Sequence, residues 1–287
     1  MVNQTNPQAI FLDMDGTLLD QYNRVSDNAK QVIDHIRKQG IYVFIATGRG
    51  KEEIYPTAPE GFEVDGVISS NGMTGYLGDE LLFEHTLPFE VVKRIVEQAR
   101  EMRIYYEVFP TSGPSQAEII DQPMLNEAVK GPRPESVGIN EWVERQEVIE
   151  RGINWVERIE DGRYSKLYTF SKSRTDIIQW QKVLDQMKQE LPFTTSSSTA
   201  HNIEIMVANK NKATGVKSFL DRIGLTSDQI LVMGDSYNDL EMFKLAGHTV
   251  AMKNAPTEIQ ALADEVTTYT CNEDGVYHYL RDRFITV

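Results

Sequence analysis

Five short apolar runs, none of which alternates with polar residues, constrain the fold of this chain more than any other feature. They occupy residues 9–12, 41–46, 67–68, 230–233 and 249–252, and small, polar or acidic residues follow each of them. Apolar runs without alternation are typical of strands buried on both faces, as in a parallel sheet covered by helices. We therefore expect these runs to form such a sheet.

The segments between the runs have the spacing of amphipathic helices. After the first run, apolar residues recur at helical intervals, Ser26 or Asp27 can cap the start of the helix, and Gly40 can end it. The pattern repeats between Lys212 and Gly224. Strands that alternate with crossover helices predict an α/β fold with a doubly wound parallel sheet, whose ligands bind at the carboxyl ends of the strands.

The middle of the chain lacks comparable runs, which indicates an inserted α+β domain. We expect helices over 88–102 and about 175–188, and strands over 104–109, 166–170, 193–197 and 203–207. The acidic stretch from Glu141 to Glu160, with Trp142 and Trp155, predicts a helix packed at an edge. The predicted organisation is a core of residues 1–85 and 208–287 with an insertion of residues 86–207.

Composition excludes several classes of partner. The chain has 43 acidic and 29 basic side chains, a net charge of -14, which disfavours nucleic acid and anionic membranes as partners. Cys271 is the single cysteine, and no apolar run approaches the roughly 18 residues of a membrane span. The first twelve residues lack the pattern of a signal peptide, so we expect a cytoplasmic protein. Nothing in the sequence indicates an oligomeric state.

The first apolar run leads directly into Asp13-Met14-Asp15-Gly16-Thr17. If the backbone stays extended there, Asp13 and Asp15 point to the same side, because residues two apart in a strand share a face. Two carboxylates would then share one pocket. The alternative interpretation is a helix cap or turn, which Asp and Gly also favour.

A second acidic group follows the fourth run, in Gly234-Asp235-Ser236-Tyr237-Asn238-Asp239. Asp235 and Asp239 are four residues apart and can converge across one helical turn. Unpaired carboxylates crowded at one sheet edge would raise one another's pKa, and a hard cation such as Mg²⁺ relieves that repulsion. The alternative interpretation is that both residues cap the following helix.

Two further segments add positive character at the same predicted edge. Thr47 and Gly48 close the second strand and offer a hydroxyl and backbone N–H groups to an anion. Lys212 opens a helix behind Asn211, so that its ammonium and the helix N-terminus can both point at the strand ends. Taken singly, each is also compatible with an ordinary turn or a surface lysine.

In this order, the four segments resemble the motifs of the haloacid dehalogenase superfamily of phosphohydrolases. The resemblance extends through Ser70-Asn71-Gly72, Ala251-Met252-Lys253-Asn254-Ala255 and Glu273-Asp274-Gly275-Val276, which are similar to segments of the Cof-like subfamily of sugar phosphatases. It covers the whole chain and implies that the insertion is a cap domain of type IIB. Ala213 and Lys253 replace glycines that are common in relatives.

The resemblance implies a role for each matched residue. Asp13 would attack phosphorus and form an aspartyl-phosphate, and Asp15 would act as the general acid and base. The expected catalytic residues are Asp13, Asp15, Thr47 and Lys212; the substrate-binding residues are Thr47, Gly48, Lys212 and Asn238; and the ligands of Mg²⁺ are Asp13, Asp15, Asp235 and Asp239. The expected ligand is a small phosphorylated molecule.

The implied activity is hydrolysis of phosphomonoesters, with sugar phosphates as substrates. Two other functions remain compatible with the residues. A phosphomutase would use the same Asp13 and Asp15 chemistry and return the phosphoryl group to the substrate. A non-catalytic phosphosugar-binding module would keep the anion pocket but would have no need of Asp15.

Overall fold

The computed structural model describes residues 7–285 and divides the chain into two compact units. Unit 1 consists of the residues up to Phe83 and from Lys210 onward, and unit 2 consists of Glu84–Asn209. The first division falls two residues before the expected boundary and the second falls two residues after it. The insertion is thus a compact unit of its own.

Unit 1 contains all the predicted α/β elements, together with further strands and helices. Its strands are β1 (Ala9–Leu12), β2 (Tyr42–Ala46), β3 (Gly66–Ser69), β4 (Thr74–Leu77), β5 (Glu80–Glu84, which reaches the division), β12 (Ile230–Gly234), β13 (His248–Ala251) and β14 (Glu265–Val266). Its helices are α1 (Asp27–Lys38), α6 (Lys212–Ile223), α7 (Leu240–Leu245), α8 (Thr257–Gln260) and α9 (Gly275–Phe284). The strands of unit 1 form one sheet in the order β14-β13-β12-β1-β2-β3-β4-β5.

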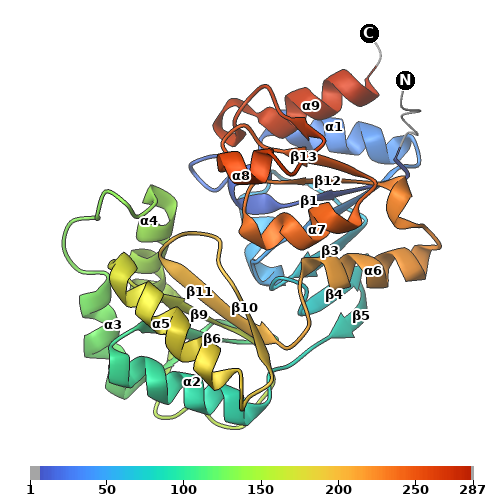
Figure 1. Ribbon diagram of the computed structural model, residues 1–287. Coiled ribbons are helices and arrows are strands. Elements are labelled where there is room, and N and C mark those ends of the chain that lie inside the picture. The colour runs from blue at the N-terminus through green and yellow to red at the C-terminus, as the bar shows by residue number, and fades with distance from the viewer. Residues whose placement is uncertain (1–6, 286–287) are drawn as a thin grey trace. The chain divides into compact units, whose positions relative to one another are not determined.

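The sheet of unit 1 is parallel from β14 to β3, and β4 pairs antiparallel with β3. In β1, Ile10 and Leu12 join the apolar cluster that contains residues of α1 and α9, whereas Phe11 joins the cluster that contains residues of α6 and α7. Figure 1 shows these two pairs of helices on opposite faces of the sheet. Burial on both faces explains why the strand sequences do not alternate.

The ends of two crossover helices follow from local sequence. Ser26 precedes α1, and its hydroxyl accepts a hydrogen bond from the N–H of Ala29. Asn211 precedes α6 in a capping box with Thr214, and Gly224 ends this helix in the left-handed conformation, with φ of 73°. These caps fix the residue at which α6 begins, which is Lys212.

Unit 2 is an α+β layer. Its strands are β6 (Tyr105–Pro110), β7 (Gln116–Glu118), β8 (Asn154–Val156), β9 (Tyr164–Phe170), β10 (Phe193–Ser196) and β11 (Asn202–Val207), and its helices are α2 (Phe89–Met102), α3 (Gln122–Ala128), α4 (Ile139–Glu147) and α5 (Arg174–Met187). The sheet order is β10-β11-β9-β6-β7-β8. All neighbours pair antiparallel except β7 and β8.

Two helices of unit 2 reach adjacent residues of β9. The indole N–H of Trp180 in α5 donates to Thr169 Oγ1 over 3.0 Å. The hydroxyl of Tyr168, one position earlier, donates to Glu141 Oε1 of α4 over 2.9 Å. Because successive side chains of a strand point to opposite faces, α5 and α4 cover opposite faces of this sheet.

The expectation of a helix through 141–160 is wrong in its second half. Helix α4 ends at Glu147, the chain turns through Val148–Gly152, and Trp155 lies in the edge strand β8. The N–H of Asn154 donates to the carbonyl oxygen of Ser115, which starts the parallel pairing with β7. A strand of three residues is too short to show an alternating pattern in the sequence.

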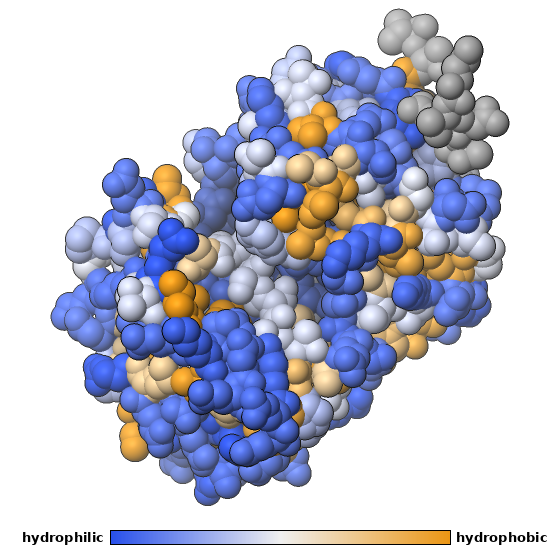
Figure 2. Space-filling model, in the orientation of Figure 1, coloured by the Kyte–Doolittle hydropathy of each residue, from blue (hydrophilic) through white to orange (hydrophobic). Residues whose placement is uncertain are grey.

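The surface on the face drawn in Figure 2 agrees with the polar composition. The face drawn in Figure 2 is mostly hydrophilic, and its apolar residues form separate small patches. Within residues 7–285, no helix has both the length and the apolar character needed to cross a membrane.

Candidate active site

The chain turns sharply at the carboxyl end of β1. The N–H of Asp13 still donates to the carbonyl oxygen of Met233 in the neighbouring strand, and residues Met14–Leu18 then form a tight helical turn. Gly16 in this turn has φ of 76°, and a Cβ atom there would lie 2.2 Å from Oδ2 of Asp235. Only glycine meets both conditions, so Gly16 allows the loops after β1 and β12 to touch.

Lys212 joins two of the expected acidic residues. Its Nζ lies 2.6 Å from Asp13 Oδ1 and 2.8 Å from Asp239 Oδ1, and its side chain is fully buried. The other oxygen of Asp239, Oδ2, accepts the N–H groups of Asp235 (3.0 Å) and Ser236 (3.1 Å). Asp239 therefore closes the loop that precedes it and pairs with Lys212; its side chain makes no capping hydrogen bond to the following helix, so the alternative interpretation is wrong for this residue.

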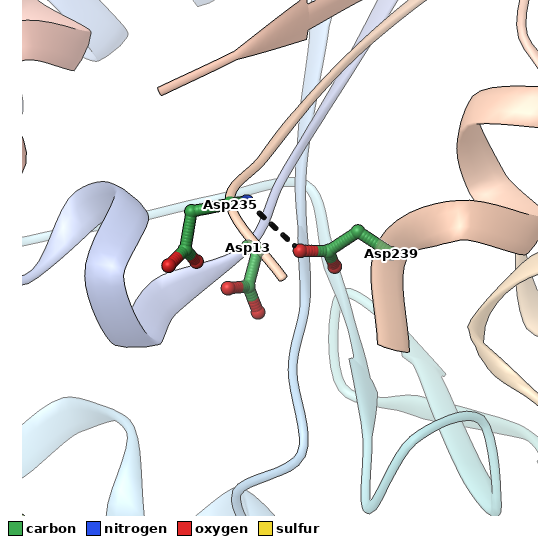
Figure 3. A group of neighbouring side chains, drawn as sticks. All are labelled: Asp13, Asp235 and Asp239. Atoms are coloured by element: carbon green, nitrogen blue, oxygen red, sulfur yellow. Dashed lines mark hydrogen bonds between the residues drawn. The ribbon is translucent and has the colours of Figure 1, made fainter. Parts of the chain in front are cut away.

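Asp13, Asp235 and Asp239 form one group of carboxylates. Figure 3 shows the three side chains together, and one oxygen from each lies within 4.8 Å of the others. A hydroxyl from the turn after β1 also reaches this group, because Thr17 Oγ1 donates to Asp235 Oδ1 over 3.2 Å. In residues 7–285 this is the one group of three His, Cys, Asp or Glu side chains with metal-binding proximity.

The charge of this group is incompletely balanced. Burial, with repulsion from Asp239, raises the pKa of Asp13 to about 7 against the opposing effect of Lys212. Burial and the charge of Asp13 likewise raise the pKa of Asp235 well above its usual range. Three carboxylates face one ammonium, and a bound cation would relieve the repulsion among them. An all-oxygen donor set suits Mg²⁺, so the residues present fit that ion.

The carboxylate of Asp15 lies outside this group. Its two oxygens pair with the guanidinium of Arg49, with Nη2 at 2.5 Å from Oδ1 and Nε at 2.9 Å from Oδ2. The Asp15 side chain is 49% exposed, whereas that of Asp13 is 4% exposed. The two aspartates therefore have different partners and different surroundings, although they are two residues apart.

Thr47 is fully buried at the end of β2. Its N–H donates to the carbonyl oxygen of Ile68, so the expectation that this N–H is available to an anion is wrong. The reason is that the pairing of β2 with β3 continues one residue beyond the strand. Its Oγ1 accepts the N–H of Arg49 over 3.1 Å. The adjacent Gly48 lies against Asn71, whose amide would be 3.4 Å from a Cβ atom at that position.

Asn238 belongs to a polar network beside Thr47. Its Oδ1 accepts from the hydroxyl of Ser236 (2.8 Å), and its Nδ2 donates to Asn71 Oδ1 (3.3 Å). The N–H of Asn71 donates to the carbonyl oxygen of Thr47 over 2.9 Å. The buried Asn71 thus links the loops that follow β2 and β12.

The structure adds residues that the motif analysis did not place in the site. They are Thr17, Arg49, Asn71 and Asn254; the last donates from Nδ2 to the carbonyl oxygen of Gly16 and accepts the N–H of Cys271. Thr17, Asn71 and Asn254 lie within segments that carried the resemblance, and Arg49 directly follows Thr47 and Gly48. Their positions in those segments were the signal that could have marked them. Burial raises the pKa of the Cys271 thiol to about 11, so this thiol is protonated at neutral pH.

A sequence model described as haloacid dehalogenase-like hydrolase matches residues 10–280 of the chain. The chain belongs to the haloacid dehalogenase-like hydrolase family. A curated relative from Bacillus subtilis, named 5-amino-6-(5-phospho-D-ribitylamino)uracil phosphatase YitU, is 28% identical over 98% of this chain and 99% of its own length. The relatives' names and the family together make this chain a phosphatase of the haloacid dehalogenase type.

Solved structures support the same fold. A haloacid dehalogenase-like hydrolase from B. subtilis has a TM-score of 0.79 and 23% identity, covering 97% of this chain and 100% of its own. The subclass IIB sugar phosphatase BT4131 has a TM-score of 0.72 and 18% identity, covering 98% of this chain and 100% of its own. These likenesses place the α/β unit and the inserted α+β unit in the architecture of the haloacid dehalogenase family.

Proposed function

We propose that this protein is a Mg²⁺-dependent phosphomonoesterase that acts on small phosphorylated metabolites through an aspartyl-phosphate on Asp13. The observation that carries the proposal is the buried Lys212 ammonium, which holds both Asp13 and Asp239 in the group of three carboxylates. A buried carboxylate held by a lysine at a sheet edge has the position and the charge environment of a nucleophile directed at a phosphate.

The first half of the reaction transfers the phosphoryl group to the protein. An oxygen of Asp13 forms a bond to phosphorus as the phosphorus–oxygen ester bond breaks, and Asp15 gives its proton to the departing alkoxide. In the second half, Asp15 takes a proton from water as the water oxygen attacks phosphorus. The bond to Asp13 then breaks, phosphate leaves, and both aspartates return to their first states.

Charge repulsion opposes the first step. A carboxylate and one phosphate charge about 4 Å apart repel by about 4 kcal/mol at an effective dielectric constant of 20. Lys212 offsets part of this repulsion because its Nζ touches Asp13. The Thr47 hydroxyl and the loop at Gly48 and Asn238 are the groups that we assign to phosphate binding, since they lie in one hydrogen-bonded network.

We assign the metal site to Asp13, Asp235 and Asp239, with Asp15 contributing through its backbone rather than its carboxylate. The carboxylate assignment rests on the proximity of the three oxygens and the raised pKa values of Asp13 and Asp235. A bound Mg²⁺ supplies positive charge that stabilises the charge developing on the phosphoryl oxygens. Asp239 already accepts two N–H groups and Lys212, so it acts mainly by holding the site in place.

Sugar phosphates are the proposed substrate class. We assign the residues of unit 1 described above to the binding of phosphate and metal. The phosphate group is common to every phosphomonoester, so these residues do not distinguish one alcohol from another. We therefore assign the choice among alcohols to unit 2, as the cap domain. The subclass IIB relative described as a sugar phosphatase, and relatives named for a ribityl phosphate, support substrates with a phosphorylated polyhydroxy chain.

A phosphate-release screen tests this proposal directly. Sugar phosphates, a ribityl phosphate and an activated aryl phosphate are incubated with the protein and Mg²⁺, and inorganic phosphate is measured. Release from several phosphomonoesters, abolished in Asp13→Asn, is the expected result. An isomeric phosphosugar without phosphate release would instead identify a mutase, and binding without turnover would identify a phosphosugar-binding module.

A further inference from the structure

The guanidinium of Arg49 forms an ion pair with the carboxylate of Asp15 through two of its nitrogens. Nε lies 2.9 Å from Oδ2 and 3.1 Å from Oδ1, and Nη2 lies 2.5 Å from Oδ1. A bidentate ion pair of this kind fixes the plane of the carboxylate as well as its distance from the guanidinium. A contact with a single ammonium does not fix the plane.

Arg49 is the better anchored partner of this pair. Its N–H donates to Thr47 Oγ1, and its carbonyl oxygen accepts the N–H of Ser70 over 2.8 Å. Its Nη2 also donates to Asn23 Oδ1 over 3.3 Å. The Arg49 side chain is 13% exposed against 49% for Asp15. The arginine is therefore a fixed support, and the aspartate is the group that it orients.

We propose that Arg49 is a positioning residue that holds Asp15 in the orientation for proton transfer; this inference rests on the proposed function. Without Arg49, the short Asp15 side chain would be free to rotate into solvent, away from the group of three carboxylates that contains Asp13. The guanidinium removes that freedom. It acts through Asp15 and not on the phosphate.

The pair also indicates which oxygen of Asp15 exchanges the proton. Among the described residues, Oδ1 accepts two hydrogen bonds from Arg49 and Oδ2 accepts one. Because each carboxylate oxygen has two acceptor positions, Oδ2 keeps one for a proton. In the first half of the reaction that proton moves to the leaving oxygen as its bond to phosphorus breaks. In the second half Oδ2 takes a proton from the attacking water.

Substrates with different leaving groups distinguish a positioning role of Arg49 from a role in binding phosphate. A nitrophenolate leaves without a proton, whereas a sugar alkoxide needs one. General acid catalysis contributes about 10² to 10⁴ in rate. We expect Arg49→Met to lower kcat/KM, which reports the steps up to release of the alcohol, by about 10-fold to 100-fold for a sugar phosphate. The kcat/KM for 4-nitrophenyl phosphate should change by less than about threefold, because nitrophenolate leaves without an acid and the later hydrolysis of the aspartyl-phosphate does not enter kcat/KM.

Two further variants make the comparison specific. Arg24→Met removes an exposed cation that follows Asn23 in the sequence and should leave both kcat/KM values unchanged, which controls for the loss of charge. In an Asp15→Asn background, Arg49→Met should add little further loss with the sugar phosphate, because the group that Arg49 orients can no longer transfer a proton. Arg49→Lys keeps the charge but not the bidentate contact. Its kcat/KM for the sugar phosphate should therefore lie between those of Arg49→Met and the wild type.

Thermal melting of each variant checks folding, and Arg49→Lys carries the same comparison if Arg49→Met does not fold. Equal losses of kcat/KM with both substrates, or a loss of kcat/KM that multiplies with that of Asp15→Asn, would overturn the positioning role and make Arg49 a phosphate ligand. An unchanged kcat/KM for the sugar phosphate would also overturn it. Absence of phosphate release by the wild-type protein from either substrate would instead overturn the proposed function, and the role of Arg49 with it.

Discussion

The ammonium of Lys212 donates to Asp13 Oδ1 over 2.6 Å, although 199 positions separate the two residues. Lys212 is the first residue of α6, and Asp13 directly follows β1. The contact joins two segments that flank the whole of unit 2 in the sequence. Several consequences of this contact and of the surrounding loops can be measured.

Replacing Lys212 should impair both stability and turnover. Lys212→Met leaves the buried Asp13 and Asp239 without their cation, at a cost of about 3 kcal/mol in the free energy of unfolding. We expect kcat/KM to fall by at least about 100-fold, because the charge facing the phosphate is lost. Lys217→Met, on the exposed face of the same helix, is the control and should change the unfolding free energy by less than about 0.5 kcal/mol. Similar behaviour of the two variants in denaturant titration and phosphate release would contradict the role of Lys212.

Gly16 should tolerate no side chain. In Gly16→Ala the new Cβ would meet Asp235 at 2.2 Å in a left-handed backbone, so the loops after β1 and β12 must separate. Gly40→Ala is a matched control, since Gly40 has φ of 83° and no atom within 4 Å of a Cβ. Both variants should lose about 1 to 2 kcal/mol of stability from the backbone conformation. Only Gly16→Ala should also lose phosphate release, and equal activity in the two would show that the approach of the two loops is not needed.

The raised pKa of Asp13 predicts how the stability of the metal-free protein depends on pH. In the folded state this pKa is about 7, above its ordinary value of 3.8, so the native state holds the extra proton between these values. The contribution of Asp13 to the unfolding free energy therefore falls as pH rises from about 4 to about 7. In chelator, Asp13→Asn should raise Tm above that of the wild type near pH 8, and the gain should shrink near pH 5. A gain that grows at lower pH would contradict the assignment.

Metal should stabilise the protein through the same carboxylates. Adding Mg²⁺ after chelation should raise Tm and restore phosphate release, and Ca²⁺ should restore little release because its larger, looser shell misplaces the phosphate. Asp235→Asn should remove most of the Tm response, while Asp221→Asn on the surface of α6 should keep it. Full phosphate release in chelator by the wild type would count against a metal at this site.

The sequence was sufficient for the parallel strands β1, β2, β3, β12 and β13 and for the acids that follow β1 and β12. The runs at β1 and β12 are buried on both faces, so their lengths and carboxyl ends could be read directly, and with them the meeting of Asp13 and Asp235. The start of α6 at Lys212 followed from its cap. These features depend on local pattern and on the parallel topology, which both appear in the sequence.

The pairing of Asp15 could not be predicted in this way. Its side-chain direction depends on the turn at Gly16, and its partner Arg49 comes from another loop, whose backbone is held by Thr47 and Ser70. The buried Asn71 is a similar case, since it lies in a left-handed conformation with φ of 56°. Such contacts depend on how loops pack across the sheet edge, and no periodic pattern records that packing.

The central claim is that Asp13 carries the phosphoryl group, and acid quenching during turnover tests it most directly. The protein is mixed with Mg²⁺ and a substrate from which it releases phosphate. The reaction is quenched in acid, and the protein is digested and analysed by mass spectrometry. The account predicts one phosphoryl group on the peptide that contains Asp13, absent in Asp13→Asn and more abundant in Asp15→Asn, which lacks the base for the second step. Turnover with no phosphoryl group on that peptide in any of these proteins would contradict it.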